Sequence, residues 1–374
     1  MYPFKDDYTL LRDCWYVGAL SKEVGSKPLG RSILDEPLVF YRTEGGEAVV
    51  TAGLCPHRFF PLSEGSVRGN SLVCLYHGIS FGSDGRCVNI PSQDMVPSNA
   101  RIRVYPNIER AGLIWVWTGA GEADVTLLPD LDKAALTAPG FWVHGHSWRQ
   151  MKGRYMSLCE NLTDLSHIGA LHARSAPGAA NHWLTAPLTV SEDAGVMRIV
   201  RTTTGPWNGF LEHQYGPELA IEAQMDMHTQ SDYFDHTCMR TSGFIIDRIH
   251  GQDSVPPEYG SSYHYHLITP ATKTSTHYFG CLSRNYRQDD PEFDRWWEVS
   301  DHHVRQEDVY GVEALEPYLD QYGDPRKELI AKADVGSVRF RRGMQRKLSA
   351  ERERYQERAA AEEIRRGTAV AVGS

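Results

Sequence analysis

The chain has 374 residues, 41% hydrophobic and 23% charged, which are ordinary proportions for a globular protein long enough to form two domains. Lysine and arginine (39) are outnumbered by aspartate and glutamate (48), and the net charge of −9 argues against a nucleic-acid-binding surface and against attraction to anionic membranes. The sequence contains no run of about 18 apolar residues and no secretory signal pattern at its start, so we expect a cytoplasmic protein.

The first 120 or so residues alternate short apolar runs with turns that contain glycine. Residues 33–42 and 47–54 predict the two strands of a hairpin around Gly45 and Gly46. Strand signals continue to the apolar run at 112–119. We therefore expect a small all-β domain in this part of the chain.

Two short clips that mix cysteine with histidine lie in that domain. Cys55-Pro-His57 is followed, after sixteen residues, by Cys74-x-x-His77. Two thiolates and two imidazoles are the ligands of a Rieske [2Fe–2S] centre, in which two cysteines hold one iron and two histidines the other. A tetrahedral zinc site uses the same atoms, but zinc fingers place both cysteines in one clip and both histidines in the other. The mixed clips therefore favour a Rieske centre.

The remaining cysteines are scattered through otherwise unremarkable sequence. An odd total of seven does not suit a disulfide framework. Buried, reduced thiols in a reducing compartment are therefore expected for Cys14, Cys87, Cys159, Cys238 and Cys281.

The segment after residue 120 is rich in small and turn-forming residues and predicts the connection between two domains, which we place at 1–122 and 123–374. Residues 155–175 lack strand alternation and predict a helix. The strand pattern returns from about 183 to 285, and 291–319 again predicts a helix. A highly charged helix at the end of the chain is predicted to lie in solvent on the surface.

The helix predicted at 155–175 carries a second group of polar residues. Spacings of three place Asn161, Asp164 and His167 on one helical face. His172 lies about 140° further round, so both imidazoles can bind one metal only if the helix breaks between them, which Gly169 permits. Two histidines and one carboxylate form the ligand set of non-haem Fe(II) oxygenases.

The third ligand must come from elsewhere if Asp164 has another role. Glu307 and Asp308 in the helix predicted at 291–319 are the best candidates, and Asp301 is the next. Consecutive residues of a helix point about 100° apart, so only one of Glu307 and Asp308 can face the metal. Spacing alone does not decide between them.

These motifs, together with the segments 112–119, 269–285 and 305–314, resemble the oxygenase component of a Rieske non-haem iron oxygenase over nearly the full length of the chain. The resemblance is to the vanillate and dicamba O-demethylase group. It implies an α+β fold, with an N-terminal all-β Rieske domain and a C-terminal helix-grip catalytic domain built from an antiparallel sheet and helices. The cluster ligands implied are Cys55, His57, Cys74 and His77.

The same resemblance assigns roles at the second site. Asp308 matches the third ligand of a mononuclear Fe(II), beside His167 and His172. Asp164 matches a carboxylate that connects His167 to the Rieske histidine, here His77, of a neighbouring subunit in a head-to-tail homotrimer. A carboxylate between two imidazoles would fix both rings and shorten the electron path. Asp164 and Asn161, from the same motif, are our candidate catalytic residues.

Substrate contacts are indicated at one further position. In the dicamba branch a histidine in the strand before a Thr-Pro turn contacts the substrate carboxylate, and His266 holds that place. A strand histidine with satisfied hydrogen bonds is an equal alternative for His266. The neighbouring polar residue of that branch is replaced around Ser242-Gly243, which favours a less charged aromatic ether or N-alkyl amide over a benzoate.

We therefore predict a terminal oxygenase that uses O2 and takes electrons from NAD(P)H through a separate reductase, with or without a ferredoxin. Hydroxylation of the carbon next to an ether oxygen or an amide nitrogen of a small aromatic substrate would release an aldehyde. Ring dihydroxylation on the same metals is one alternative. A Rieske electron carrier is another, but such a protein would not need His167, His172 and Asp308.

Overall fold

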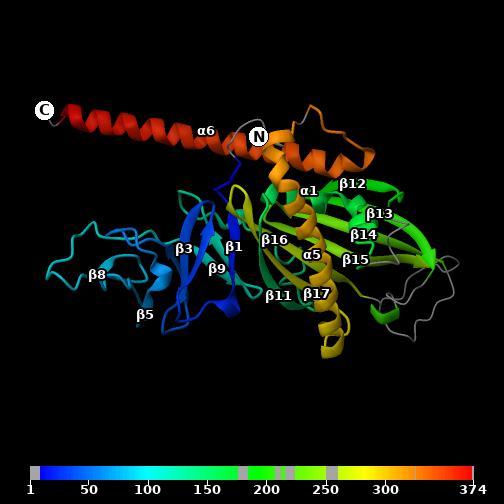
Figure 1. Cartoon of the computed structure of the whole chain (residues 1–374), viewed down its shortest axis with the longest axis horizontal. Helices are drawn as coiled ribbons and strands as arrows, with labels where there is room; N and C mark the ends of the chain where they lie inside the picture. The colour runs from blue at the N-terminus through cyan, green and yellow to red at the C-terminus, as the bar shows by residue number, and fades with distance from the viewer. Residues whose placement is uncertain are drawn as a thin grey trace.

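The structure of the protein is a computed structural model. The residues described are 9–175, 184–206, 212–214, 224–249, 260–324 and 326–372. Figure 1 shows small β-sheets at one end of the molecule and a large sheet with helices at the other. The last helix runs along one side and extends past the small sheets.

Ten short strands within residues 9–117 form three antiparallel sheets. The first contains β1 (Trp15–Leu20), β10 (Leu113–Trp117) and β9 (Asn107–Arg110), and the second contains β2 (Leu29–Ile33), β3 (Glu36–Arg42) and β4 (Ala48–Ala52). The third contains β5 (Ser66–Arg68), β6 (Ser71–Val73), β7 (Ser80–Phe81) and β8 (Cys87–Asn89). Arg42 pairs with Ala48 in β3 and β4, so the predicted hairpin is confirmed.

The second half of the chain is built on a seven-stranded antiparallel sheet in the order β11-β17-β16-β15-β14-β13-β12. Its strands are β11 (Trp142–Met151), β12 (Leu188–Asp193), β13 (Val196–Pro206), β14 (Gln224–Asp235), β15 (Cys238–Ile249), β16 (Ser262–Thr272) and β17 (Ser275–Arg284). Nine of the ten residues of β17 are buried, because this strand lies inside the sheet and is covered on both faces. The strands predicted between 183 and 285 are confirmed in the described part of that range.

Two layers cover the large sheet. On one side Tyr265 and Phe279 pack against Trp115 of β10 and Leu131 of the segment between the two halves. On the other side lies the long helix α5 (Pro291–Tyr322), whose Trp297 packs beside β17. Asp290 caps α5 by accepting a hydrogen bond from the backbone N–H of Phe293, and proline follows at the first helical position.

The helix predicted over 155–175 is interrupted, at Asp164. α1 (Tyr155–Thr163) ends at Asp164, whose φ of −116° and ψ of 93° are those of an extended residue. A single turn of 3-10 helix, η4 (Leu165–His167), and the short α2 (Ile168–Leu171) follow. The break occurs at Asp164 and precedes both histidines, whereas the sequence suggested Gly169.

The C-terminal helix α6 (Val335–Val372) is less exposed than its charge predicts. Phe340, Met344 and Leu348 form a buried stripe along its first half. Glu351, which is fully buried, accepts hydrogen bonds from the backbone N–H groups of Arg12 (2.8 Å) and Asp13 (2.6 Å). α6 therefore holds the N-terminal segment in place. In the described part of the chain no helix is both long and apolar enough to cross a membrane.

One hydrophobic core joins the two halves of the molecule. Tyr16 and Phe40 from the N-terminal sheets belong to the same buried cluster as Met239 and Ile268 from the large sheet. The hydroxyl of Thr269 also donates a hydrogen bond to the main-chain oxygen of Val17 (2.7 Å). All seven cysteines are free and buried, which agrees with the prediction for the five outside the clips.

His236 lies at this junction, in the turn between β14 and β15. Its Nε2 lies 3.0 Å from the hydroxyl of Tyr16 and 3.6 Å from the thiol of Cys14, and the ring is fully buried. Burial lowers the pKa of His236 from 6.5 to about 4. The folded protein therefore holds this histidine neutral.

We expect the stability of the folded chain to fall as the pH is lowered from 6.5 towards 4. Over this window the unfolded chain takes up a proton on His236 and the folded chain does not, so about 3 kcal/mol should be lost by pH 4. Denaturant unfolding of the parent and of His236→Gln at pH 7.5 and 5.0 measures this loss. The variant should have a shallower pH dependence, while the exposed control His303→Gln should not; equal slopes would contradict the assignment.

Candidate metal centres

The two cysteine–histidine clips form loops with the same backbone hydrogen bonds. The backbone N–H of Cys55 donates to Phe60 and its oxygen accepts from Phe59; in the second loop Cys74 makes the same pair of bonds with Ile79 and Gly78. The residue four positions after each cysteine has a positive φ, 56° at Phe59 and 70° at Gly78. The loops are therefore matched, although the histidine stands two residues after the cysteine in one and three in the other.

The four predicted cluster ligands meet at the tips of these loops. Cys55 and Cys74 are each 1% exposed within a small core, while His57 and His77 are exposed at the surface. The Nδ1 atoms of the two histidines lie 3.2 Å apart. Burial, with a smaller contribution from Cys74, raises the pKa of the Cys55 thiol to about 11. A bound metal would supply the positive charge that such a buried thiolate needs.

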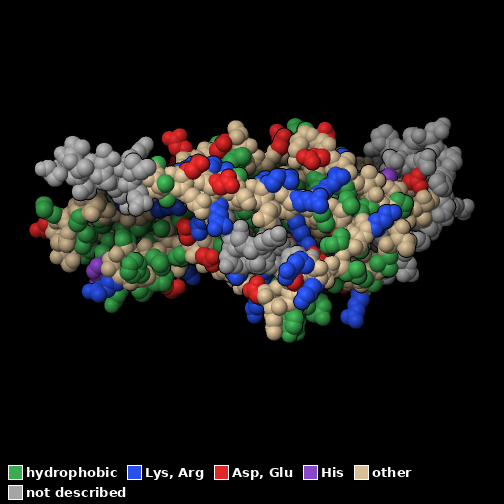
Figure 2. Space-filling view, turned by 90° about the horizontal axis from the view of Figure 1, so that it is seen from above, with side chains coloured by type: hydrophobic (Ala, Val, Ile, Leu, Met, Phe, Trp, Pro, Cys, Tyr) green, Lys and Arg blue, Asp and Glu red, His purple; other side chains and the backbone are tan. Residues whose placement is uncertain are grey.

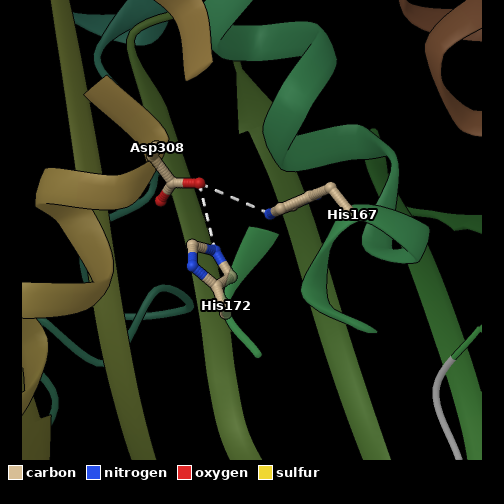
Figure 3. A group of neighbouring side chains, drawn as sticks. All are labelled: His167, His172 and Asp308. Atoms are coloured by element: carbon tan, nitrogen blue, oxygen red, sulfur yellow. Dashed lines mark ion pairs between the residues drawn. The ribbon is translucent and has the colours of Figure 1, made fainter. Parts of the chain in front are cut away.

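The second site brings together His167 from η4, His172 directly after α2 and Asp308 from α5, with one ligand atom of each within 4.8 Å of the others (Figure 3). Oδ1 of Asp308 lies 3.4 Å from Nε2 of His167 and 3.2 Å from Nε2 of His172. Asp308 is 2% exposed and His172 is 3% exposed. The helix break at Asp164 lets both rings turn towards α5.

The electrostatics of this group fix its protonation. Burial alone would raise the pKa of Asp308, but hydrogen bonds from His167 and His172 outweigh it and hold that pKa far below its usual range. The amide of Asn161 also donates to Oδ1 of Asp308 (2.6 Å). Burial would lower the pKa of His172, yet its contacts with Asp308 and Glu307 raise it. Asp308 is therefore held as a carboxylate beside the two imidazoles.

Glu307 and Asp308 have different roles, which spacing could not decide. Asp308 faces both histidines, while Glu307 accepts a hydrogen bond from the other ring nitrogen of His172, Nδ1, at 2.9 Å. The hydroxyl of Ser175 donates to the same oxygen of Glu307 (2.6 Å). Glu307 therefore orients His172 and leaves its Nε2 for the metal. The sequence pattern indicated Glu307 only as an alternative metal ligand.

Replacing Glu307 by alanine should weaken iron binding at the second site by about 10- to 100-fold, because His172 would lose the partner that fixes its ring. The measurement is the rate at which a chelator removes iron, followed together with the visible spectrum of the cluster. Gln306→Ala, at an exposed neighbouring position of α5, is the matched control. Equal rates of iron loss in Glu307→Ala and the parent would contradict this role.

Asp164 contacts His167 differently from the predicted arrangement. Nδ1 of His167 meets the main-chain oxygen of Asp164 rather than its carboxylate. The carboxylate accepts hydrogen bonds from the backbone N–H (2.8 Å) and the hydroxyl (2.9 Å) of Ser166. Because Nδ1 of His167 is already occupied, its Nε2 is the atom directed at Asp308.

The remaining candidates lie on strands β15 and β16 of the large sheet. Both ring nitrogens of His266 have protein partners, with Nε2 2.8 Å from the hydroxyl of Thr241 and Nδ1 against the hydroxyl of Tyr278. Ser242 is buried, and its hydroxyl accepts a hydrogen bond from the backbone N–H of Gln230. The surroundings of Gly243 lie outside the described part of the chain.

Asp301, the other carboxylate considered as a ligand, is not part of the triad. Its two oxygens lie 2.8 Å from Nδ1 of His264 and 2.6 Å from Nε of Arg305. Both carboxylate oxygens of Asp301 are therefore occupied by hydrogen bonds to residues of α5 and β16.

The donor atoms at both sites suit iron. Two buried thiols and two facing imidazoles are the ligand set of a Rieske cluster, and two imidazoles with one carboxylate leave positions open on a non-haem Fe(II). A zinc finger is less suitable, because each loop supplies one cysteine and one histidine.

Comparison with known proteins finds matches to both halves of the chain. Residues 14–106 match the Rieske [2Fe-2S] domain, and residues 151–350 match the vanillate O-demethylase oxygenase C-terminal domain. The chain is 33% identical over 320 residues to the dicamba O-demethylase oxygenase component of Stenotrophomonas maltophilia, covering 82% of this chain and 88% of that protein. It is 31% identical over 348 residues to a vanillate O-demethylase oxygenase subunit of a Pseudomonas species, covering 91% and 96%.

A third relative has a different name. The oxygenase component of chloroacetanilide N-alkylformylase from Rhizorhabdus wittichii is 28% identical over 354 residues, covering 91% of this chain and 96% of that protein. Among solved structures, dicamba monooxygenase bound to 3,6-dichlorosalicylic acid has a TM-score of 0.79 at 29% identity, covering 92% of this chain and 99% of that one. Dicamba monooxygenase with non-haem iron and dicamba has a TM-score of 0.75.

These matches confirm the predicted fold class, an all-β Rieske domain followed by an antiparallel sheet with helices. They also confirm the predicted Rieske cofactor and the class of enzyme, an oxidoreductase that works as one component of a system with separate electron donors. The chain belongs to the family of Rieske non-haem iron oxygenase components that includes the vanillate and dicamba O-demethylases.

Proposed function

We propose that this protein removes an alkyl group from a small aromatic ether or N-alkyl amide by oxidation with O2. The observation that carries the proposal is the presence, in one chain, of a cysteine–histidine pair of loops and a buried group of two histidines and a carboxylate. An electron carrier needs only the first of these sites, and this distinguishes the two classes.

The residues have separate tasks in this proposal. Cys55, His57, Cys74 and His77 would hold the cluster, and His167, His172 and Asp308 the mononuclear iron. When bound, these groups supply single electrons and the oxidation of a carbon–hydrogen bond by O2. The protein fixes the ligands through Asn161 and Glu307 and keeps Asp308 away from water.

The proposed reaction balances as follows. An aryl methyl ether, O2, two electrons and two protons give the aryl alcohol, formaldehyde and water. One oxygen atom enters the methyl carbon, and the resulting hemiacetal loses formaldehyde when its carbon–oxygen bond breaks. An N-alkyl amide would react in the same way through a hemiaminal. The electrons come from NAD(P)H through a reductase, with or without a ferredoxin.

We propose a head-to-tail homotrimer, the assembly that the family resemblance implies, and the positions of the two sites within one chain support a neighbouring copy at the cluster. The sheet that carries β5 and β8 and the helices α1 and α5 lie in different parts of the molecule (Figure 1). Phe59 is 74% exposed, Leu75 68% and Tyr76 56%, beside the exposed His57 and His77. Hydrophobic side chains also gather at this end of the molecule in Figure 2. A neighbouring copy covering this surface would bring its Asp164 to the cluster.

We place the boundary between the Rieske and catalytic domains near residue 122, giving domains of 1–122 and 123–374. The matches at 14–106 and 151–350 lie on either side of residue 122, which supports this proposal. The three small sheets end with β10 at Trp117, and the large sheet begins with β11 at Trp142.

Product analysis tests the proposed reaction. Reconstituted protein, a bacterial ferredoxin reductase pair and NADH are incubated with a panel of aryl methyl ethers and N-alkyl anilides under oxygen-18. Release of formaldehyde or another aldehyde with one labelled oxygen atom is expected. A cis-dihydrodiol carrying two labelled atoms would assign ring dihydroxylation, and reduction of the cluster without any O2-dependent product across the panel would contradict an oxygenase.

A further inference from the structure

A cavity lies between the start of α6 and the strands β12 and β13, at one edge of the large sheet (Figure 1). Its volume is about 380 Å³. The apolar part of its wall consists of Leu184, Ala186, Pro187, Leu188, Val190 and Val335. Leu184 is 49% exposed and Val335 is 42% exposed, so this apolar wall is open to solvent. A cavity of this size and lining suits a ligand with one or two aromatic rings.

Basic side chains complete the wall of this cavity, namely Arg201 of β13, Lys332 from the turn before α6, and Arg339 of α6. Arg201 is buried, and its Nη1 donates a hydrogen bond to the main-chain oxygen of Ala186 (2.9 Å). Arg339 is exposed and reaches β12, with Nη1 3.5 Å from the main-chain oxygen of Val190. No aspartate or glutamate stands among the described residues that line the cavity. The wall is therefore positively charged.

Carboxylates close to the cavity leave two of these cations without a charged partner. Burial lowers the pKa of Arg201, and the negative charge of Asp164 opposes this, so Asp164 acts on Arg201. Asp334, two residues after Lys332, accepts a backbone hydrogen bond at Oδ2 (2.6 Å). Within the described ranges, Lys332 and Arg339 form no ion pair with an aspartate or glutamate. Their charges are therefore available to an anionic ligand.

The part of the wall that α6 forms is held in place by α1. An added Cβ at Gly336 would lie 2.4 Å from the main-chain oxygen of Thr163, so the two helices are in direct contact. The hydroxyl of Ser337 lies 3.2 Å from that of Thr163. One turn further along α6, Arg341 forms an ion pair with Glu160 of α1. The cavity is therefore formed before a ligand binds, which lowers the entropic cost of binding.

We propose that this cavity is a second ligand site of the protein and binds a small aromatic carboxylate. The carboxylate would pair with the guanidinium of Arg339 and the ammonium of Lys332, and the ring would lie on the apolar wall. A neutral aromatic compound of the same shape would leave both charges unpaired and bind more weakly. Neither histidine of the iron site lines the cavity, and neither does Asp308. Binding here is therefore independent of the mononuclear metal and of the proposed dealkylation.

Two fluorescent probes of the same shape, 2-naphthoate and 2-naphthamide, test the proposal by titration of the full-length protein with both metal sites loaded. The parent should bind the naphthoate at least about 10-fold more tightly than the naphthamide. Lys332→Gln/Arg339→Gln removes both charges from exposed side chains, so the fold is retained. This variant should weaken the binding of naphthoate by at least about 10-fold and reduce the ratio to within about 3-fold.

Three further variants locate the ligand. Arg342→Gln/Lys347→Gln removes the same charge from exposed positions of α6 outside the cavity and should keep the parent ratio. Asp308→Ala, which changes the iron site, should also keep the parent affinity for the naphthoate. Val335→Glu places a carboxylate in the cavity wall and should abolish the preference for the naphthoate.

The outcomes that would overturn the proposal are no binding of naphthoate by the parent, no preference over naphthamide, or the parent ratio in Lys332→Gln/Arg339→Gln. An equal loss in Arg342→Gln/Lys347→Gln would mean that only the net charge of α6 matters, and this also overturns it. A loss confined to Asp308→Ala would place the ligand at the iron site, with the same consequence. Aldehyde release from aryl methyl ethers tests the proposed function separately, because no residue of the cavity belongs to the metal centres.

Discussion

Replacing Asp308 by alanine is expected to remove one iron per chain and all oxygenase activity, while the cluster remains. The parent should contain about three irons and two acid-labile sulfides per chain, and the variant about two of each. Asp308 is the one residue of the triad that contacts both histidines, so its loss leaves two imidazoles without a charged ligand. Iron and sulfide analysis and the visible and electron paramagnetic resonance spectra of the cluster measure the result.

The control for Asp308→Ala is Glu292→Gln, which neutralises an exposed carboxylate in the first turn of the same helix. It should retain the parent iron content and activity. Two irons in both the parent and Asp308→Ala would mean that the triad binds no iron, and the chain would then be an electron carrier. Loss of the cluster in Asp308→Ala would instead indicate a general failure to fold.

Replacing Asp164 by asparagine should slow turnover by about 10- to 100-fold without changing the metal content. Asparagine can still accept the hydrogen bond from the backbone of Ser166, so the turn after α1 is kept. What is lost is the negative charge that would connect the cluster histidine of a neighbouring copy to this site. Stopped-flow absorbance should show normal reduction of the cluster and slow reoxidation by O2 in the presence of substrate.

Ser166→Ala is the partner experiment for Asp164. It removes the hydroxyl that donates to the carboxylate and leaves the charge in place. Reoxidation in Ser166→Ala should therefore stay close to the parent rate. Reoxidation at the parent rate in Asp164→Asn would rule out this carboxylate as part of the electron path.

The sequence alone could predict that these two cysteines and two histidines lie together, because all the information is local. Cysteine and histidine at spacings of two and three residues define each clip, and the chemistry of four such donors excludes most alternatives. The matched backbone bonds of the two loops explain why different spacings work. In both loops the backbone N–H of the fourth residue after the cysteine, Phe59 or Gly78, donates a hydrogen bond to the cysteine oxygen. The histidine lies within the turn that this bond closes.

The second site was only partly predictable, because its residues meet through tertiary structure. The helix containing Asn161 and His167 was foreseen, but not the break at Asp164, whose side chain caps the next turn through Ser166. An aspartate within a helical pattern is a weak signal of a helix end. Glu307 could not be separated from Asp308 by periodicity, since its partner His172 is 135 residues away.

The buried face of α6 could not be predicted from the sequence, because most residues of this helix are charged or polar. Phe340, Met344 and Leu348 are spaced like a core-facing stripe, but they are surrounded by arginine and glutamate. Glu351 completes the same face and is fully buried, because two backbone N–H groups of the N-terminal segment compensate its charge. A charged residue at that position predicts a side chain exposed to solvent, unless its hydrogen-bond partner is known.

The single core shared by Tyr16, Phe40, Met239 and Ile268 limits how this protein can be engineered. Exchanging cluster segments between relatives is an attractive way to build chimaeras with new reduction potentials. A crossover near residue 122 would interrupt no helix or strand. It would nevertheless bring together an N-terminal domain and a catalytic domain whose contacting surfaces had each been packed against a different domain. A working chimaera must therefore take the contacting residues of β1 and β3 and those of β15 and β16 from the same relative. The two sides of the interface between the domains then remain matched.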